Sequence, residues 1–457
     1  MHACLPYNLP TLVMVIADLL EHVDGLLGKK EDLKLKNLLM RHSHTDIALV
    51  LDRLSHGKRK TFALLPPEIQ AEVALLTTEN TRAFILPRLS DHALARFLHF
   101  NNEDDAADLL HELPAERRSL ILRHIKDEKR VKIEKLLKFS PETAGGLMDL
   151  NFITVSEDET IKTVSDKVRQ HVQNHKQAPI VIVLDNHDHL LGFVPYRTLM
   201  FNVPVKPVGD FLTPLTVTSS KTDQEKVLKM ATQNKADLIG VVDEGQFLGV
   251  IHLHDLLRVA QMEATEDFYL FAGVNKEEEL SDSALAAVKF RYVWLIINLA
   301  TAFLAAFVVS LFETTIAKTA ILAAYMPIVA GMGGNAGTQT LAVVVRGLAL
   351  GEGTRRKGWW WRVISKEAVA GLINGLINGL IVAAVVFVFK GTVEIGIILL
   401  LSMVINLVIA GVFGAIVPLA LKAMKVDPAI SATVFVTTAT DVFGFLAFLG
   451  LASVFIR

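Results

Sequence analysis

The chain has 457 residues, 51% of them hydrophobic, and a formal net charge of −2 at pH 7. Its mean hydropathy of +0.41 is too high for an ordinary soluble protein and indicates an integral membrane protein. The single cysteine, Cys4, excludes an intramolecular disulfide and a thiolate metal cluster, which is typical of soluble parts that face a reducing cytosol.

The charges are unevenly distributed along the chain. Residues 1–285 carry 33 basic and 42 acidic side chains, a net charge of −9, whereas residues 286–457 carry 13 basic and six acidic side chains, a net charge of +7. An acidic soluble half beside a basic apolar half argues against nucleic acid as a partner and favours cations and the lipid bilayer. We expect no signal peptide, because the apolar stretch Thr11–Leu20 contains Asp18 and runs directly into Glu21.

Residues 1–137 are expected to form an all-α superhelical N domain of stacked helical pairs. Three of its units begin with helix-start signals, at Leu65–Glu68, Leu89–His92 and Leu113–Glu116. An acidic run that includes Asp104, Asp105 and Asp108 interrupts the series. Most runs of this kind lie on a solvated surface.

Two β-α-β-β-α units follow the helical domain. Their strand-like segments are Phe152–Val155, Ala178–Leu184 and Leu190–Val194, and then Pro214–Val217, Asp237–Val242 and Phe247–Ile251. The repeat resembles a tandem pair of CBS domains, at residues 138–204 and 205–260, and such modules often bind adenine nucleotides. In that family an Asp six positions after a Gly holds the ribose, and Asp255 follows Gly249 at this spacing. ATP is therefore a candidate ligand, with Asp255 as its ribose contact.

Five later segments are long and apolar enough to cross a bilayer as helices, which takes about 20 residues each. They are Val293–Phe312, Ala320–Leu350, Glu367–Phe389, Ile395–Leu421 and Ala429–Ile456. Basic residues, among them Arg355, Arg356 and Lys357, gather at alternate ends of these spans. The positive-inside rule then predicts a multi-pass protein of the cell (inner) membrane, with a cytoplasmic N-terminus and Arg457 outside. The fold class is thus a multi-domain membrane protein with a five-helix transmembrane domain at residues 286–457.

Asp441 is the exception among the acidic residues of this half, because the others lie at span edges. It lies 12 residues into the last span. This is roughly 18 Å along a helix, near the middle of a hydrocarbon core about 30 Å thick. A carboxylate there costs several kcal/mol unless it meets water, a partner or a cation. We interpret Asp441 as a cation site; the alternative is a protonated structural Asp bonded to Ser or Thr.

The second span contains the glycine-rich run 331–340, which is expected to break the helix at similar depth. Irregular backbone in a bilayer is tolerated where it lines a water-filled cavity or is buried in protein. Free carbonyls from Gly331 to Gly334, with the amide of Asn335, would offer the oxygen ligands that Mg²⁺ or Ca²⁺ prefers. A packing kink is the alternative interpretation.

With these residues in hand, the chain resembles the MgtE family of magnesium channels over nearly its whole length. The most specific segments are Pro327–Gln339 in the second span and Thr437–Asp441 in the fifth. The resemblance implies a homodimer with one central pore, in which Asp441 of each subunit holds hydrated Mg²⁺. It also implies a filter of Gly331, Gly334 and the Thr437 carbonyl, with Thr338 standing where relatives often carry Asn.

The resemblance further implies a gate that responds to intracellular Mg²⁺. A connecting helix in residues 254–285 carries Glu263, which is expected to meet Asp427 through bound Mg²⁺. The other regulatory candidates are Asp104, Asp105, Asp108 and Asp255. Mg²⁺ would neutralise these acidic surfaces and close the pore.

The expected function is therefore Mg²⁺ uptake through a selective channel, with Mg²⁺ both transported and regulatory. An enzyme is not expected, because the sequence holds no nucleophile–base pair, P-loop or metal-hydrolase motif. Two alternatives stay open. One is a divalent cation transporter coupled to Na⁺ or H⁺, and the other is a membrane-anchored nucleotide sensor without transport.

Overall fold

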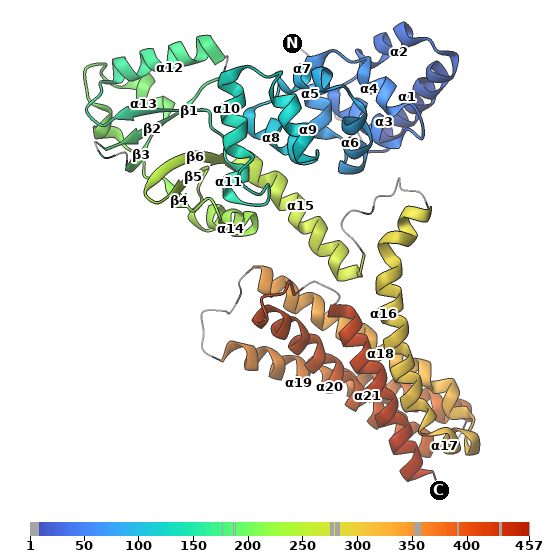
Figure 1. The fold of residues 1–457 in the computed structure, drawn as a ribbon. Coiled ribbons are helices and arrows are strands. Elements are labelled where there is room, and N and C mark those ends of the chain that lie inside the picture. Colours follow the sequence, from blue (N-terminus) through green and yellow to red (C-terminus); the bar gives the residue numbers. More distant parts are fainter. Residues whose placement is uncertain are drawn as a thin grey trace. The chain divides into compact units, whose positions relative to one another are not determined.

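The computed structural model describes residues 9–175, 177–185, 187, 189–274, 278, 284–350, 352, 358–390, 393–428 and 432–456. The chain divides into two compact units, the first ending at Glu263 and the second beginning at Ala264, and each is described by itself (Figure 1). The residues named above that lie outside the described part of the chain are Cys4, Arg355, Arg356, Lys357, Ala429 and Arg457.

Short helices form the start of the first unit. They are α1 (Leu9–Lys29), α2 (Asp32–Leu39), α3 (His44–Arg53), α4 (Lys58–Ala63), α5 (Pro67–Leu76), α6 (Glu79–Ile85), α7 (Asp91–Leu98), α8 (Glu103–His111), α9 (Ala115–Leu122), α10 (Asp127–Leu136) and α11 (Ala144–Leu147). The three predicted helix starts are confirmed. Pro66 and Pro114 directly precede α5 and α9, and the Ser90 hydroxyl accepts a hydrogen bond from the Ala93 amide at 3.2 Å before α7. The acidic run does not interrupt the series, because it forms α8.

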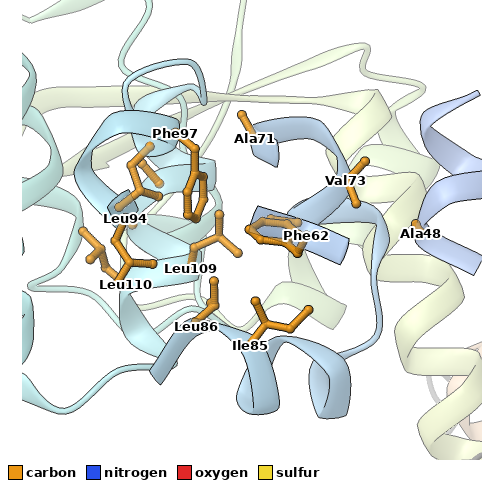
Figure 2. Close-up of a cluster of buried hydrophobic side chains, with 14 of the residues drawn as sticks. Ala48, Phe62, Ala71, Val73, Ile85, Leu86, Leu94, Phe97, Leu109 and Leu110 are labelled. Carbon is orange, nitrogen blue, oxygen red and sulfur yellow. The ribbon is translucent and has the colours of Figure 1, made fainter. Parts of the chain in front are cut away.

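One hydrophobic core joins these helices to later parts of the first unit. Phe62 and Phe97 meet edge to face at its centre, with ring centroids 5.8 Å apart (Figure 2). Buried residues of the second CBS domain and the following helix, including Ile251, Leu256 and Val259, belong to the same core. The first CBS domain has a separate core that contains Val164 and Val183.

The two CBS repeats have the predicted β-α-β-β-α order. The first contains β1 (Phe152–Ser156), α12 (Ile161–His175), β2 (Ile180–Leu184), β3 (Leu190–Val194) and α13 (Tyr196–Phe201). The second contains β4 (Thr216–Thr218), α14 (Gln224–Asn234), β5 (Leu238–Asp243), β6 (Gln246–His252) and α15 (Leu253–Ala272). In each three-stranded sheet the first two strands are parallel and the last two antiparallel. Glu244 and Gly245 both have positive φ in the tight turn between β5 and β6.

Five helices of the second unit are long and apolar enough to cross a membrane, counting the described residues only. They are α16 (Ala284–Ser310), α18 (Ile321–Ala349), α19 (Trp359–Lys390), α20 (Val393–Ala423) and α21 (Ala432–Phe455), and a short α17 (Glu313–Lys318) precedes α18. α19 begins eight residues before the predicted start of the third span. Glu367, expected at a span edge, therefore lies inside the helix.

The predicted break in the second span is wrong, because residues 331–340 are helical throughout. Their glycines serve close packing. A Cβ atom added at Gly333 would overlap the Asn406 side chain, and one at Gly337 would overlap Val436. Carbonyls of a continuous helix accept the amides of the next turn, so they are not free ligands.

Asn406 of α20 is the polar centre of this packing and is fully buried. Its Nδ2 donates a hydrogen bond to the Val329 carbonyl of α18 at 2.8 Å. Gly333 of α18 and Gly444 of α21 both approach its amide, and a Cβ atom at Gly444 would lie 2.8 Å from Nδ2. Three helices therefore meet at one side chain.

We expect Gly333→Ala to destabilise the membrane unit, because the new methyl group would overlap the Asn406 side chain. Overpacking of this kind typically costs about 1–3 kcal/mol. The matched control is Gly331→Ala in the same helix, where the added Cβ has open space and helix propensity gains up to about 1 kcal/mol. Thermal unfolding of the full chain in detergent, followed by Trp fluorescence, compares the two. Equal midpoints would show that Asn406 does not constrain α18.

Candidate functional site

The predicted pore residues of the second span share one face of α18. Gly331, Gly334, Asn335 and Thr338 follow the spacing i, i+3, i+4 and i+7, which places them on a single helical face. Gly331 and Asn335 are exposed, and Gly334 and Thr338 are half-buried. A Cβ atom at Gly331 would meet nothing within 4 Å. This face therefore opens outward in the single chain.

The predicted residues of the fifth span lie beside that face. Thr437 and Asp441 are one turn apart on α21, and the Thr437 Cγ2 atom is 3.8 Å from a Cβ position at Gly334. The Thr437 carbonyl, predicted as a filter ligand, already accepts the Thr440 hydroxyl at 2.9 Å. The two helical faces thus adjoin, but they present side chains and glycine surfaces rather than free carbonyls.

Asp441 is the tenth residue of α21 and is half-buried. Within the described part of the chain its carboxylate makes no hydrogen bond and no ion pair. The carboxylate therefore fits a cation or its hydration water.

Glu367 is a second internal carboxylate that the sequence analysis placed at a span edge. It is only 8% exposed in α19. Its Oε2 accepts a hydrogen bond from Thr340 Oγ1 at 3.2 Å, and its Oε1 lies 3.0 Å from the Lys366 ammonium. Unlike Asp441, this carboxylate is satisfied by protein groups.

A polar cavity of about 340 Å³ lies in the first unit, where α8 meets α15. Four carboxylates, two imidazoles and one guanidinium line it with three amide side chains: Asn102, Asp104, Asp105, Asp149, Asn151, Gln177, His252, His254, Asp255 and Arg258. We call it the acidic pocket. It brings together three of the predicted regulatory residues, Asp104, Asp105 and Asp255.

Of the residues that line the acidic pocket, Asp104 has the least favourable electrostatic surroundings. It is 9% exposed, and its Oδ1 has no hydrogen-bond partner among the described residues. Burial, and then the neighbouring carboxylates of Asp105, Asp149 and Asp255, raise the pKa of Asp104 well above its usual value. Burial also raises the pKa of Asp105, although Arg258 opposes this. A bound cation would relieve the repulsion.

Asp108 belongs to the same acidic helix and shares Arg258 with the pocket. The Arg258 guanidinium lies 3.7 Å from a carboxylate oxygen of Asp105 and 3.7 Å from one of Asp108. Burial raises the pKa of Asp108 to about 7, with Arg258 opposing the shift. The expectation of a solvated acidic run is therefore wrong, because α8 packs these carboxylates against α15.

The other two regulatory candidates are Glu263, which does not line the acidic pocket, and Asp427, which belongs to the second unit. Glu263 is eight residues beyond Asp255 on α15, and its Oε1 accepts a hydrogen bond from Gln224 Nε2 at 2.6 Å. Asp427 is exposed in the second unit, after α20. Among the described residues, no three His, Cys, Asp or Glu side chains converge closely enough to hold a bare metal ion.

Sequence reasoning missed Asp149 and Arg258 in the acidic pocket. Asp149 precedes β1, and its backbone pairs with Val250 of β6, which brings it to the start of α15. The spacing from Gly249 to Asp255 was the one available signal in the sequence. It indicated a functional residue near this end of β6 but did not indicate which residues lie next to it.

Three family profiles match the chain. The MgtE divalent cation transporter domain matches residues 326–451, the MgtE intracellular N domain matches residues 43–142, and CBS domains match residues 144–204 and 208–261. These matches, together with the helical domain, the CBS pair and the five apolar helices, identify a multi-domain membrane transporter of divalent cations. The chain belongs to the MgtE family of magnesium transporters.

Relatives of known name agree over most of the chain. It is 29% identical over 449 residues to the magnesium transporter MgtE of Bacillus subtilis (strain 168), covering 90% of this chain and 97% of the relative. It is 28% identical over 427 residues to that of Thermus thermophilus, covering 92% and 94%. The solved cytosolic domain of the Mg²⁺ channel MgtE in complex with ATP aligns with 24% identity and a TM-score of 0.47, covering 52% of this chain and 98% of that one.

The raised pKa of Asp108 predicts a pH dependence. A carboxyl group whose folded-state pKa lies above its unfolded value stabilises the fold when protonated, and this stability is lost as pH rises through the folded pKa. The first unit should therefore loosen around α8 between pH 6 and 8 when divalent cations are chelated, around the pKa of about 7. Because 35% of the Asp108 side chain stays exposed, the effect should stay below the roughly tenfold change in local opening expected for full burial.

Hydrogen exchange of α8 peptides in the full chain measures this opening. Taking the ratio of wild type to Asp108→Asn at each pH removes the intrinsic pH dependence of exchange. The ratio should rise with pH, whereas the control Asp127→Asn, whose side chain is 86% exposed, should give a constant ratio. A ratio for Asp108→Asn that stays flat from pH 6 to 8 would contradict the assignment.

Proposed function

We propose that the chain is a Mg²⁺-selective channel for Mg²⁺ uptake, with Asp441 as its pore carboxylate. The observation that carries the proposal is the half-buried Asp441 inside α21, without a protein partner in the described residues, beside the open face of Gly331 and Gly334. Membership of the MgtE family supports the choice of ion.

A homodimer accounts for the open face. Two-fold packing brings the same surface of two subunits together. Two copies of the Gly331–Thr338 face and of Asp441 would then line one central pore, with the N-terminus cytoplasmic and the C-terminus outside as the positive-inside rule predicts. Glycines leave room for a wide passage, which suits Mg²⁺ because this ion gives up its waters reluctantly.

The proposed gate uses the acidic pocket. Without divalent cations, Asp104, Asp105 and Asp255 repel one another across the junction of α8 and α15. Hydrated Mg²⁺ in the pocket would draw the two helices together and close the channel. Glu263 and Asp427, one in each unit, stay predicted partners through Mg²⁺.

ATP stays a predicted ligand of the CBS pair. We assign Asp255 to the cation site rather than to a ribose, because the phosphates of a nucleotide bound there would face the four carboxylates of the acidic pocket.

A transporter coupled to Na⁺ or H⁺ is the second candidate function. Coupling through a second carboxylate would use Glu367, the other internal acid of the described spans. Its oxygens already contact Thr340 and Lys366, so we favour the channel. Discrete single-channel current steps carried by Mg²⁺ would support the channel, and strict dependence of flux on a Na⁺ or H⁺ gradient would support the carrier.

Asp441→Asn should abolish Mg²⁺ flux while leaving the fold intact, because it removes the pore charge and keeps the side-chain shape. Flux into proteoliposomes that hold a Mg²⁺-sensitive dye, and rescue of a strain that lacks its own Mg²⁺ uptake, measure the loss. The control is Glu394→Gln, an exposed carboxylate in the first turn of α20 that should keep full flux. Rescue by Asp441→Asn at normal membrane abundance would refute the pore assignment.

Mg²⁺ should also slow proteolysis of the full chain at the linkers near Pro141 and residues 204–207, because a closed pocket compacts the first unit. Asp104→Asn combined with Asp255→Asn should weaken this protection and leave the channel open at high Mg²⁺. Asp158→Asn, which removes an exposed carboxylate outside the pocket, is the control. Equal cleavage rates with and without Mg²⁺ would mean that the soluble part is not a magnesium sensor.

A further inference from the structure

A second cavity lies in the membrane unit, between the start of α19 and the end of α20. It has a volume of about 590 Å³. Three consecutive tryptophans and small or aliphatic residues line it with one charged side chain: Trp359, Trp360, Trp361, Ile364, Ile416, Leu419, Ala420, Lys422 and Ala423. We call it the tryptophan cavity. Its residues are distinct from the Asp441 face and from the acidic pocket.

The tryptophan cavity lies where two spans begin and end. The aromatic run starts α19, and Lys422 lies one residue before the end of α20. Trp360 and Trp361 stay 51% and 62% exposed, and their rings meet edge to face at 5.8 Å. Tryptophans gather at membrane–water interfaces because one part of the ring is apolar and the N–H is wet. The cavity therefore opens at the level where lipid headgroups join their acyl chains.

Its polar side is cationic. Lys422 Nζ donates a hydrogen bond to the Leu348 carbonyl at 3.4 Å, which holds the ammonium at the cavity wall. Arg362 does not line the cavity but follows the tryptophans directly; it is exposed and makes no side-chain hydrogen bond or ion pair within the described residues. The first turn of α19 adds amide N–H groups and the positive end of the helix dipole. None of the described residues that line the cavity is a carboxylate.

We propose that the tryptophan cavity binds an anionic phospholipid. The acyl chains lie against Trp360, Ile416 and Leu419, and the phosphate and the charged headgroup meet Lys422 and Arg362. Juxtamembrane cations of this kind attract anionic lipids. This inference goes beyond the proposed function, because the site requires no ion in the pore.

A second copy of the chain fits the tryptophan cavity less well. Two-fold packing would set each Lys422 against the same patch of the other subunit. Because the described lining holds no acid, like charges would meet in an apolar surrounding. An anionic lipid instead brings its negative charge to this cationic side of the cavity and covers the exposed rings.

Quenching of Trp fluorescence by brominated lipids tests the proposal on the full chain in liposomes. The sequence has four tryptophans, so Trp294→Phe leaves only the three that line the cavity. In this variant, brominated phosphatidylglycerol should quench the Trp fluorescence more strongly than brominated phosphatidylcholine does at equal mole fraction. One cation near the surface is worth about a fivefold preference.

Charge variants test which side chains cause the preference for the anionic lipid. Lys422→Gln and, independently, Arg362→Gln should each lower it about fivefold or abolish it, and Lys422→Arg should retain it. Lys425→Gln is the matched control, since Lys425 is an exposed cation of the same helix end that does not line the cavity. Equal quenching by the two lipids would overturn the proposal. Quenching by neither would also overturn it, and would show that protein, such as a second copy, covers the cavity.

Discussion

The membrane unit depends on one buried amide. Asn406 can lie between Gly333 and Gly444 only because neither neighbour has a side chain, and its hydrogen bond to Val329 fixes the rotation of α18. With Gly333 and Gly337 turned inward, helical geometry turns Gly331 away from the packed helices, and Gly334 lies between the two sides, next to Thr437. The face that we propose to line the pore is thus a consequence of internal packing, and it needs no irregular backbone.

Three carboxylates of the protein differ in role because their surroundings differ. Glu367 is buried and bonded to Thr340 and Lys366, so it contributes to helix association. Asp441 is half-buried without a protein partner in the described spans, so its carboxylate is available to a cation. Asp104 is buried among other acids, so its pKa is raised, and a cation would relieve the repulsion at the junction of α8 and α15.

The sequence predicted features that depend on neighbouring residues, and it was ambiguous about features that depend on a residue distant in the chain. Helix starts before α5, α7 and α9, the CBS repeat, the five spans and the isolation of Asp441 all follow from neighbouring residues or hydrophobic periodicity. The glycine run was misinterpreted because a helix break and a close helix crossing need the same residues, and only Asn406 distinguishes them. The raised pKa of Asp104 results from its burial and from carboxylates that include Asp149 and Asp255, which lie far away in sequence.

The shared core of the first unit has a consequence for cooperativity. The N-terminal helices, the second CBS sheet and α15 share one core, which joins the start of the chain to residues more than two hundred positions later. They should unfold as a single unit. The first CBS domain has a core of its own, but a further cluster that contains Ile182, Leu238 and Val250 joins its sheet to the second one. A displacement of α15 would then be transmitted directly to the N-terminal helices.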